Sequence, residues 1–300
     1  MSRVAEFEYL EARTVQEACA LLREHGEEAK LIAGGIALAI LLKYDLLRPR
    51  YLINIKTIPG LDRIECDPER GLSVGALVRH QWIADSPAIA EHYPVLSAAA
   101  GHVASLPIRH MGTVGGSITH ADPATDMASA LIAAGARVHM QNVDGERVLP
   151  VEEFFVDTFE TQLAPGEILT RITVAPELAG RSGAHEKLRK NATDIPIVSA
   201  SVSVASEGAE VSDLRIGLAA AAPRPIRCPR AEDALRGGNA STAGLEEAAA
   251  MASEEAEPVS DLRGSADYRR KMVRVLVRRA LTGALGANGV SLREGNRKGR

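Results

Sequence analysis

Aromatic side chains are scarce in this sequence. Its 300 residues include 4 Phe, 5 Tyr and 1 Trp, together 3% of the chain. Hydrophobic residues still reach 46% and charged residues 25%, a balance typical of globular rather than disordered chains. The sequence therefore predicts a folded protein whose core consists mainly of Ala, Val, Leu and Ile.

Cysteine is also rare. Cys19, Cys66 and Cys228 lie far apart, and no Cys-x-x-Cys pair or iron–sulfur spacing occurs. His120 and Asp122 have no third potential ligand near them in sequence, which argues against a metal site. We therefore expect reduced, mostly buried thiols. We expect no metal or cluster in this chain itself.

Long apolar runs and a strong excess of one charge are both missing. The longest apolar stretch, residues 31–42, contains two glycines and falls short of the roughly 20 residues that span a bilayer. The first residues carry acids and do not resemble a secretory signal. The net charge of −4 argues against a nucleic-acid partner. These features predict a soluble, cytoplasmic protein without a transmembrane segment.

One segment near the end of the chain is strongly basic. Residues 268–281 have helical spacing, with Tyr268, Met272, Leu276 and Ala280 on an apolar stripe. The cations of this segment are Arg269, Arg270, Lys271, Arg274, Arg278 and Arg279. We interpret them as a solvated or subunit-facing side of a packed helix, and nucleic-acid or membrane-surface binding as the weaker alternative.

The pattern of predicted elements divides the chain into three parts. Residues 1–57 alternate helix and strand, beginning with a capping-box helix after Thr14. Residues 58–177 mix strands at 72–74, 137–140 and 168–174 with helices at 83–90, 94–104 and 127–134. A Pro/Gly/Ser break at 175–184 precedes a three-stranded meander and three helices, near 230–236, 244–256 and 265–283. This order predicts an α+β protein.

Paired glycines occur twice in similar apolar settings. Gly34–Gly35 follow a predicted strand, and Gly115–Gly116 lie within "GTVGGSITHADPATD", residues 112–126, where we also expect a strand before the pair. Glycine lets the amides of a turn converge and lets a ligand approach closely, so such turns bind phosphates without needing a cation. The alternative is that each pair serves only a tight turn. Neither loop matches the dinucleotide or P-loop fingerprint.

Asp126 follows the second glycine pair and begins an apolar segment. Its carboxylate is suited to capping a helix, and equally suited to accepting hydrogen bonds from a ribose. The residues alone leave both roles open.

The sequence resembles the FAD-binding medium subunits of the molybdenum hydroxylases, of the carbon monoxide dehydrogenase and xanthine dehydrogenase type. "AGG" at 33–35 and the 112–126 segment carry the resemblance. It extends through "PGEILTRI" (165–172), "KLRKNATDIPIVSAS" (187–201) and "SDLRGSADYRRKMVRVLVRRAL" (260–281). The resemblance implies an FAD-binding fold of the vanillyl-alcohol oxidase (PCMH) type. That fold would consist of two α/β subdomains, residues 1–57 and 58–177, followed by a C-terminal α+β domain, residues 178–300, with a three-stranded sheet and helices.

The resemblance also implies an FAD site and no catalytic or metal-binding residue. The diphosphate would be held by Ala33, Gly34, Gly35, Ile36, Ala37 and Leu38, with a second clamp from Thr113, Gly115, Gly116 and Ser117. Asp126 would bind the ribose, Ile168 and Leu169 would pack against the flavin or adenine, and Lys187 would approach the isoalloxazine ring. The sequence departs from the family pattern at Ala37, at Ser117 and in "RKNATD", residues 189–194.

The implied function is that of an electron-transfer subunit in an oxidoreductase complex. FAD in this chain would pass electrons from two [2Fe–2S] clusters of a small subunit to an external acceptor. A large molybdopterin-binding subunit would hold the molybdenum cofactor, and the subunits would form an (LMS)2 heterohexamer. The alternative is a stand-alone FAD-dependent reductase or oxidase of the same fold.

Overall fold

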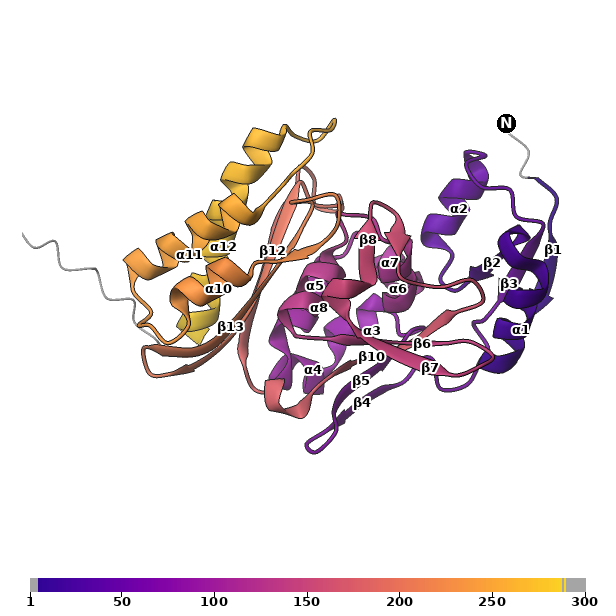
Figure 1. Ribbon diagram of the computed structural model, residues 1–300, viewed down its shortest axis with the longest axis horizontal. Coiled ribbons are helices and arrows are strands. Elements are labelled where there is room, and N and C mark those ends of the chain that lie inside the picture. Colours follow the sequence, from indigo (N-terminus) through magenta and orange to yellow (C-terminus); the bar gives the residue numbers. More distant parts are fainter. Residues whose placement is uncertain (1–4, 288, 290–300) are drawn as a thin grey trace, which may run out of the picture.

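The protein is described here by a computed structural model that covers residues 5–287 and Gly289. Three main units follow one another along the long axis of the molecule, and each contains its own sheet (Figure 1). Their order in space is their order in sequence.

The first unit is a small parallel sheet with two helices. Its strands pair in the order β1-β3-β2. Thr14 caps the first helix, because its Oγ1 accepts a hydrogen bond from the Glu17 amide at 3.1 Å, which confirms the predicted capping residue. The elements are β1 (Glu8–Glu11), α1 (Val15–His25), η1 (Gly26–Glu28), β2 (Ala29–Ile32), α2 (Ile36–Lys43) and β3 (Tyr51–Asn54).

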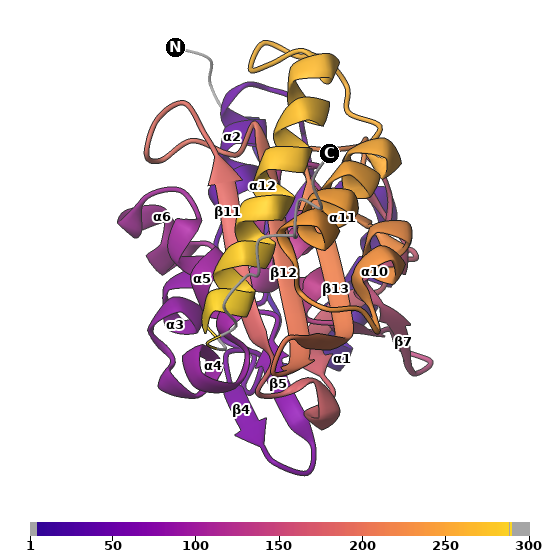
Figure 2. The ribbon, with the colours of Figure 1, turned by 90° about the vertical axis from the view of Figure 1, so that its left-hand side faces the viewer.

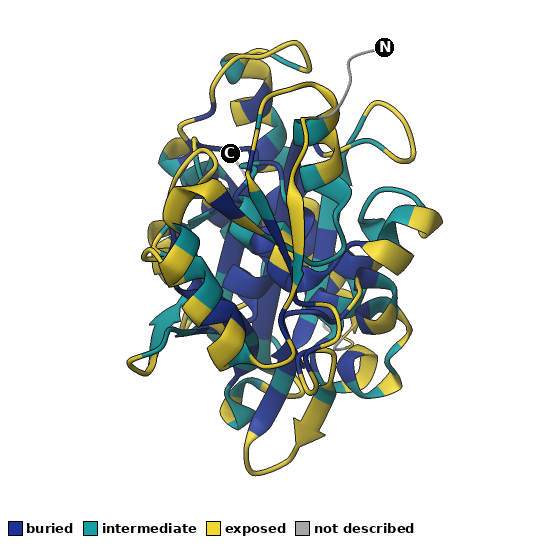
Figure 3. Ribbon diagram, turned by 90° about the vertical axis from the view of Figure 1, so that its right-hand side faces the viewer, coloured by how far each residue is buried: buried dark blue, intermediate teal, exposed yellow. Residues whose placement is uncertain are grey.

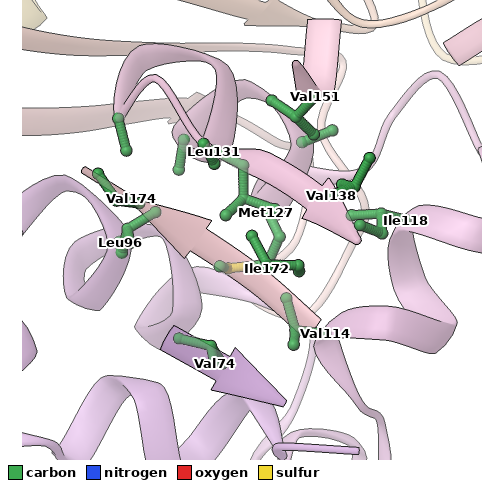
Figure 4. Packing of buried hydrophobic residues seen from close by; sticks show 14 of the residues in the cluster. Val74, Leu96, Val114, Ile118, Met127, Leu131, Val138, Val151, Ile172 and Val174 are labelled. Carbon is green, nitrogen blue, oxygen red and sulfur yellow. The ribbon is translucent and has the colours of Figure 1, made fainter. Parts of the chain in front are cut away.

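The second unit contains a five-stranded antiparallel sheet in the order β4-β5-β10-β6-β7. Helices α5 and α8 pack on this sheet, and Figure 4 shows Leu96, Met127 and Leu131 meeting strand side chains such as Ile172. The strands are β4 (Ile64–Asp67), β5 (Gly71–Gly75), β6 (Arg137–Gln141), β7 (Glu146–Pro150) and β10 (Ile168–Val174), with a small hairpin of β8 (Phe155–Asp157) and β9 (Glu160–Thr161). The helices are α3 (His80–Asp85), α4 (Pro87–His92), α5 (Pro94–His102), α6 (Leu106–Met111), α7 (Val114–His120), α8 (Asp126–Ala133) and α9 (Val151–Phe154).

The helix predicted over residues 83–90 is wrong as a single element. Ser86 interrupts it with extended backbone angles, φ −74° and ψ 113°. Ser86 precedes Pro87, and the proline ring disfavours helical geometry in the residue before it. Two short helices, α3 and α4, result.

The third unit is a four-stranded antiparallel sheet, in the order β11-β12-β13-β14, with three helices on one face. The three long strands and the three helices match the predicted elements. A fourth strand of two residues, β14, extends the predicted three-stranded sheet by pairing with the end of β13. The elements are η2 (Pro176–Leu178), β11 (Ser182–Leu188), β12 (Val198–Glu207), β13 (Glu210–Ala219), β14 (Ile226–Arg227), α10 (Pro229–Leu235), α11 (Thr242–Glu255) and α12 (Ala266–Ala287).

Both faces of this last sheet are covered, which accounts for the small, mostly buried residues of β12. Helices α10, α11 and α12 cover the outer face, and α5 and α8 lie between the inner face and the sheet of the second unit (Figures 1 and 2). Gly217 on β13 is needed for the close approach, because a Cβ there would lie 2.1 Å from the carbonyl oxygen of Ser129 on α8. Most residues of β12 and β13 are accordingly buried. Figure 3, which views the molecule from the side of the first unit, shows buried residues in the interior and exposed residues mainly on outer helices, loops and edge strands.

Arg269 corrects the prediction that the cations of the basic helix are all solvated or subunit-facing. Its side chain is 5% exposed and forms an ion pair with Asp261. Its Nη1 also donates to the carbonyl oxygens of Ile197 and Ala220, at 2.9 and 3.2 Å. Arg269 therefore ties the start of α12 to the ends of β12 and β13.

The structure also shows the lengths and apolar character of the helices and the state of the cysteines. No helix within residues 5–287 is both long enough and apolar enough to cross a membrane. All three cysteines are free thiols, with Cys19 and Cys228 buried and Cys66 exposed.

Glu232 on α10 supplies a stability test for the third unit. Its side chain is fully buried, accepts a hydrogen bond from the Ile216 amide at 2.9 Å and pairs with Arg227 at 2.7 Å. Glu232→Ala leaves the buried Ile216 amide without its acceptor and removes the shorter of the two ion pairs of the partly exposed Arg227, so we expect a loss of about 2 kcal/mol in the free energy of unfolding. Urea denaturation measures this loss. The exposed Glu247, changed to Ala, serves as the control and should alter stability by less than about 0.5 kcal/mol; equal losses in both variants would contradict this role of Glu232.

Candidate functional site

The first glycine loop presents backbone amides that have no acceptor. Gly35 is the N-cap of α2 and adopts left-handed angles, φ 73° and ψ 1°, which glycine tolerates without strain. Within residues 5–287, no hydrogen bond uses the amides of residues 34–38. Free amides at a helix N-terminus, with no acidic side chain in the first turn, form a place suited to an anion.

The first loop lies directly against the segment that precedes the second glycine pair. A Cβ built on Gly34 would lie 2.1 Å from the carbonyl oxygen of Met111 and 3.0 Å from Cα of Gly112. Only a glycine permits this approach of two backbones. The structure therefore places the first loop directly against residues 111–112, which immediately precede the segment of Thr113, Gly115, Gly116 and Ser117.

The second glycine pair has a different local structure from the first, and the strand expected before it is wrong. Helix α6 precedes it, and Gly115 and Gly116 lie in the first turn of α7, where Thr113 Oγ1 accepts from the Gly116 amide at 3.1 Å. The amides of Val114 and Gly115 donate to Val78 and Ala76 carbonyls, both at 2.9 Å. This loop therefore has few free amides to offer an anion.

Gly115 is required by packing within the chain. A Cβ on Gly115 would lie 2.6 Å from both Cβ and the carbonyl oxygen of Ala76, whereas one on Gly116 would approach only Thr113 Oγ1, at 2.9 Å. Gly116 and Ser117 are more open than Gly115. The loop thus combines a buried packing position with a neighbouring accessible one.

Ile168 and Leu169 are buried at the start of β10. The Ile168 side chain belongs to the core of the first unit, and the Leu169 side chain to that of the second. The next residue, Thr170, accepts from the Ala76 amide at 2.9 Å, and Ala76 in turn accepts from Gly115. Both positions therefore lie close to the second loop, with their side chains directed into the cores.

Asp126 and Lys187 form a buried ion pair. Lys187 Nζ lies 2.6 Å from Asp126 Oδ2, and the two side chains are 2% and 5% exposed. Lys187 also donates to the carbonyl oxygen of His102 at 3.0 Å. Thr125, not Asp126, occupies the N-cap of α8, so the capping role considered from the sequence is not the one observed.

Three histidines that the sequence reasoning missed surround this ion pair. Burial lowers the pKa of His80 to about 4, although the nearby Asp126 charge acts in the opposite direction. Burial also lowers the pKa of His102, assisted by the neighbouring His185. The sequence contained a sign of His185 in its spacing. His185 precedes Lys187 by two residues on β11, so the two side chains lie on the same face of the strand.

Apolar side chains remain exposed around the loops. No residue of α2 is buried, and Ile40 on this helix is 53% exposed. Met111, at the junction of the loops, is 57% exposed. Trp82 on α3 stacks with the guanidinium of Arg79, 4.9 Å from the ring centroid, and Arg79 pairs with Thr113 through a β-bridge. In the part of the chain that the structure describes, no group of three or more His, Cys, Asp or Glu is arranged to hold a metal ion.

Two known families match successive segments of the chain. Residues 5–177 match the family described as "FAD binding domain in molybdopterin dehydrogenase". Residues 183–284 match the family described as "CO dehydrogenase flavoprotein C-terminal domain". The first match alone covers more than half of the chain.

Individual relatives match over almost their whole length. The chain is 35% identical to the alpha subunit of the 6-hydroxypseudooxynicotine dehydrogenase complex of Paenarthrobacter nicotinovorans, covering 93% of this chain and 94% of the relative. It is also 35% identical to the carbon monoxide dehydrogenase medium chain of Hydrogenophaga pseudoflava, covering 93% and 96%. A solved structure of carbon monoxide dehydrogenase from Hydrogenophaga pseudoflava superposes with a TM-score of 0.92, covering 95% of this chain and 99% of that chain.

His80 makes the stability of the protein depend on pH in a defined direction. Its folded-state pKa, about 4, lies below the ordinary 6.5 expected in the unfolded chain. As the pH falls from about 6.5 to about 4, the unfolded chain binds a proton that folded His80 excludes, so this group costs stability progressively. Relative to wild type, His80→Gln should therefore lose less stability on acidification, by up to about 1.4 kcal/mol per pH unit. Denaturant unfolding at several pH values measures the difference, and parallel curves for the two proteins would refute it.

Proposed function

This chain belongs to the family of FAD-binding medium subunits of molybdopterin dehydrogenases, and on that premise we propose that it passes electrons from [2Fe–2S] clusters of a partner subunit, through FAD, to an external acceptor. Its relatives are subunits of dehydrogenase complexes, and the chain is accordingly an oxidoreductase subunit. The proposal concerns the route of the electrons and the residues that hold the cofactor.

The observation that carries the proposal is the contact between the two glycine loops. The unpaired amides of residues 34–38 suit the FAD diphosphate, because backbone N–H groups bind phosphate oxygens without a cation. Gly34 brings these amides against the second loop. We propose that the first contact set is Ala33, Gly34, Gly35, Ile36, Ala37 and Leu38, and the second Thr113, Gly115, Gly116 and Ser117. Because the second loop has already used most of its amides, its contribution would come from close contact and the Ser117 side chain.

The remaining cofactor contacts would come from β10 and from the boundary between the second and third units. Ile168 and Leu169 would support the flavin or adenine through the β10 backbone, since their side chains are committed to the cores. Lys187 would approach the isoalloxazine ring with Asp126 as its counter-ion, and the Asp126 carboxylate would accept the ribose hydrogen bond in addition to that from Lys187. The bound FAD would supply a two-electron carrier, while this chain would fix its position and electrostatic surroundings.

The partners follow from the same family. The relative from Hydrogenophaga pseudoflava is named as a medium chain, which places it in a complex of several subunits. We propose a small subunit with two [2Fe–2S] clusters, a large molybdopterin-binding subunit, and an (LMS)2 assembly. The three units would correspond to domains at residues 1–57, 58–177 and 178–300. The three unpaired thiols support a reducing compartment, the cytoplasm.

Purification with and without partner chains tests the proposal. The complex isolated gently should show a flavin absorption spectrum, and substrate should bleach it only when both partner subunits are present. A chain that oxidises a substrate alone would instead support a stand-alone flavin enzyme. A complex that binds no FAD would refute the proposal.

Gly34→Ala tests the junction of the loops. Its Cβ would meet the Met111 carbonyl at 2.1 Å, so the two loops must separate and the cofactor contacts on both sides cannot be made together. We expect FAD affinity to fall by at least about tenfold, or ~1.4 kcal/mol. Isothermal titration of flavin-free protein with FAD measures the change. Gly101→Ala, in helix α5 with nothing within 4 Å of the added Cβ, is the control and should retain normal affinity; equal affinities in the two variants would contradict the placement.

A further inference from the structure

A chain of buried hydrogen bonds joins α8 to strands β11 and β12. His185 Nδ1 lies 2.8 Å from Ser201 Oγ, which lies 2.9 Å from Ser129 Oγ. Ser129 Oγ also lies 2.9 Å from the backbone carbonyl oxygen of Asp126. The side chain of His185 is 0% exposed, so water does not complete its hydrogen bonds from the surface.

The directions of these hydrogen bonds follow from one fixed acceptor. The Asp126 carbonyl can only accept, so Ser129 must use its single hydroxyl proton there. Ser201 must then donate its own proton to Ser129. With that proton used, Ser201 can only accept from His185, so Nδ1 of His185 carries a hydrogen.

This assignment leaves Nε2 of His185 facing a carboxylate. Nε2 lies 3.6 Å from Asp126 Oδ1, and neither atom has a hydrogen-bond partner within the described part of the chain. If the ring were neutral, two lone pairs would face each other in a buried site, each without a donor. A second ring proton on Nε2 removes this conflict and places an imidazolium beside the carboxylate.

Among the titratable groups around Asp126, His185 is the one placed to hold this additional proton. His102 on α5 has its ring centroid 5.5 Å from that of His185, and burial lowers its pKa. His80 on α3 is held neutral by burial, with a pKa of about 4. The charge of Arg109 on α6 adds to the effect of burial in lowering the pKa of His80, and the charge of Arg189 after β11 does the same for His102. Lys187 is already paired with Asp126.

We propose that His185 is a positioning residue that carries a positive charge and holds Asp126 from the side opposite to Lys187, giving this buried cluster one net positive charge. The cluster comprises Lys187, Asp126 and His185. Resting on the proposed function, the net charge would favour reduced over oxidised FAD, because reduction adds negative charge beside Lys187. Without His185, Asp126 would cancel the charge of Lys187.

The charge of His185 is tested on the full-length, flavin-free protein. Nitrogen-15 NMR of histidine-labelled protein at pH 7.5 should show one buried ring with both nitrogens protonated. His185→Gln should remove that signal, and Ser201→Ala should shift it, which assigns it even if the first variant folds poorly. An unprotonated Nε2 in the assigned ring would overturn the proposal.

The effect on the cofactor is tested separately by spectroelectrochemical titration of the FAD-loaded complex. His185→Gln should favour oxidised FAD by about tenfold, lowering the midpoint potential by ~30 mV for a two-electron couple. His92→Gln, at the end of α4, is the matched control and should leave the potential unchanged. A charged His185 with an unchanged potential would overturn the link to the flavin. Absence of FAD from the wild-type complex would instead refute the proposed function and leave the NMR result standing.

Discussion

The ion pair between Lys187 and Asp126 ties the third unit to the second. Both side chains are almost wholly buried, and burial of a single charge without a partner would cost several kcal/mol. Each residue therefore requires the other, and β11 can bring Lys187 to α8 only if the inner face of its sheet packs closely. The absence of a Cβ at Gly217 and the small serines of β12 provide that closeness. The same pair thus helps to fix how the second and third units sit against each other.

The two glycine loops make a second constraint of a different kind. At Gly34 the requirement is steric, since no side chain fits between two backbones. At Gly35 it is conformational, because the residue turns the chain left-handed to begin α2. The first loop has free amides and the second has largely used its own, so the site is asymmetric although its sequence motifs look alike. Similar glycine pairs here serve an open turn with free amides and a packed helix start.

Local patterns predicted much of the fold. Strand β10 spans the predicted residues 168–174, because alternating apolar residues identify a central strand, and Thr14 caps the first helix as its spacing indicates. Strands β4 and β7 were not predicted. Both are edge strands, and their sequences, "IECD" and "ERVLP", contain polar residues that obscure the apolar pattern of a strand. The pairing of Asp126 with Lys187, 61 residues apart, depends on tertiary contacts that no local pattern contains. The burial of Arg269 could not be predicted for the same reason, because it donates to the backbone carbonyls of Ile197 and Ala220, which are distant in sequence.

The scarcity of aromatic residues gives the molecule an unusually simple optical signature. Its single tryptophan, Trp82, lies against Arg79, and Arg79 is bridged to Thr113 at the start of the second loop. Intrinsic fluorescence excited at the red edge of protein absorption therefore originates from one indole next to the junction of the loops. A rearrangement of the loops that alters the surroundings of Trp82 would change this emission, so the single indole serves as a reporter at the place where the two loops meet.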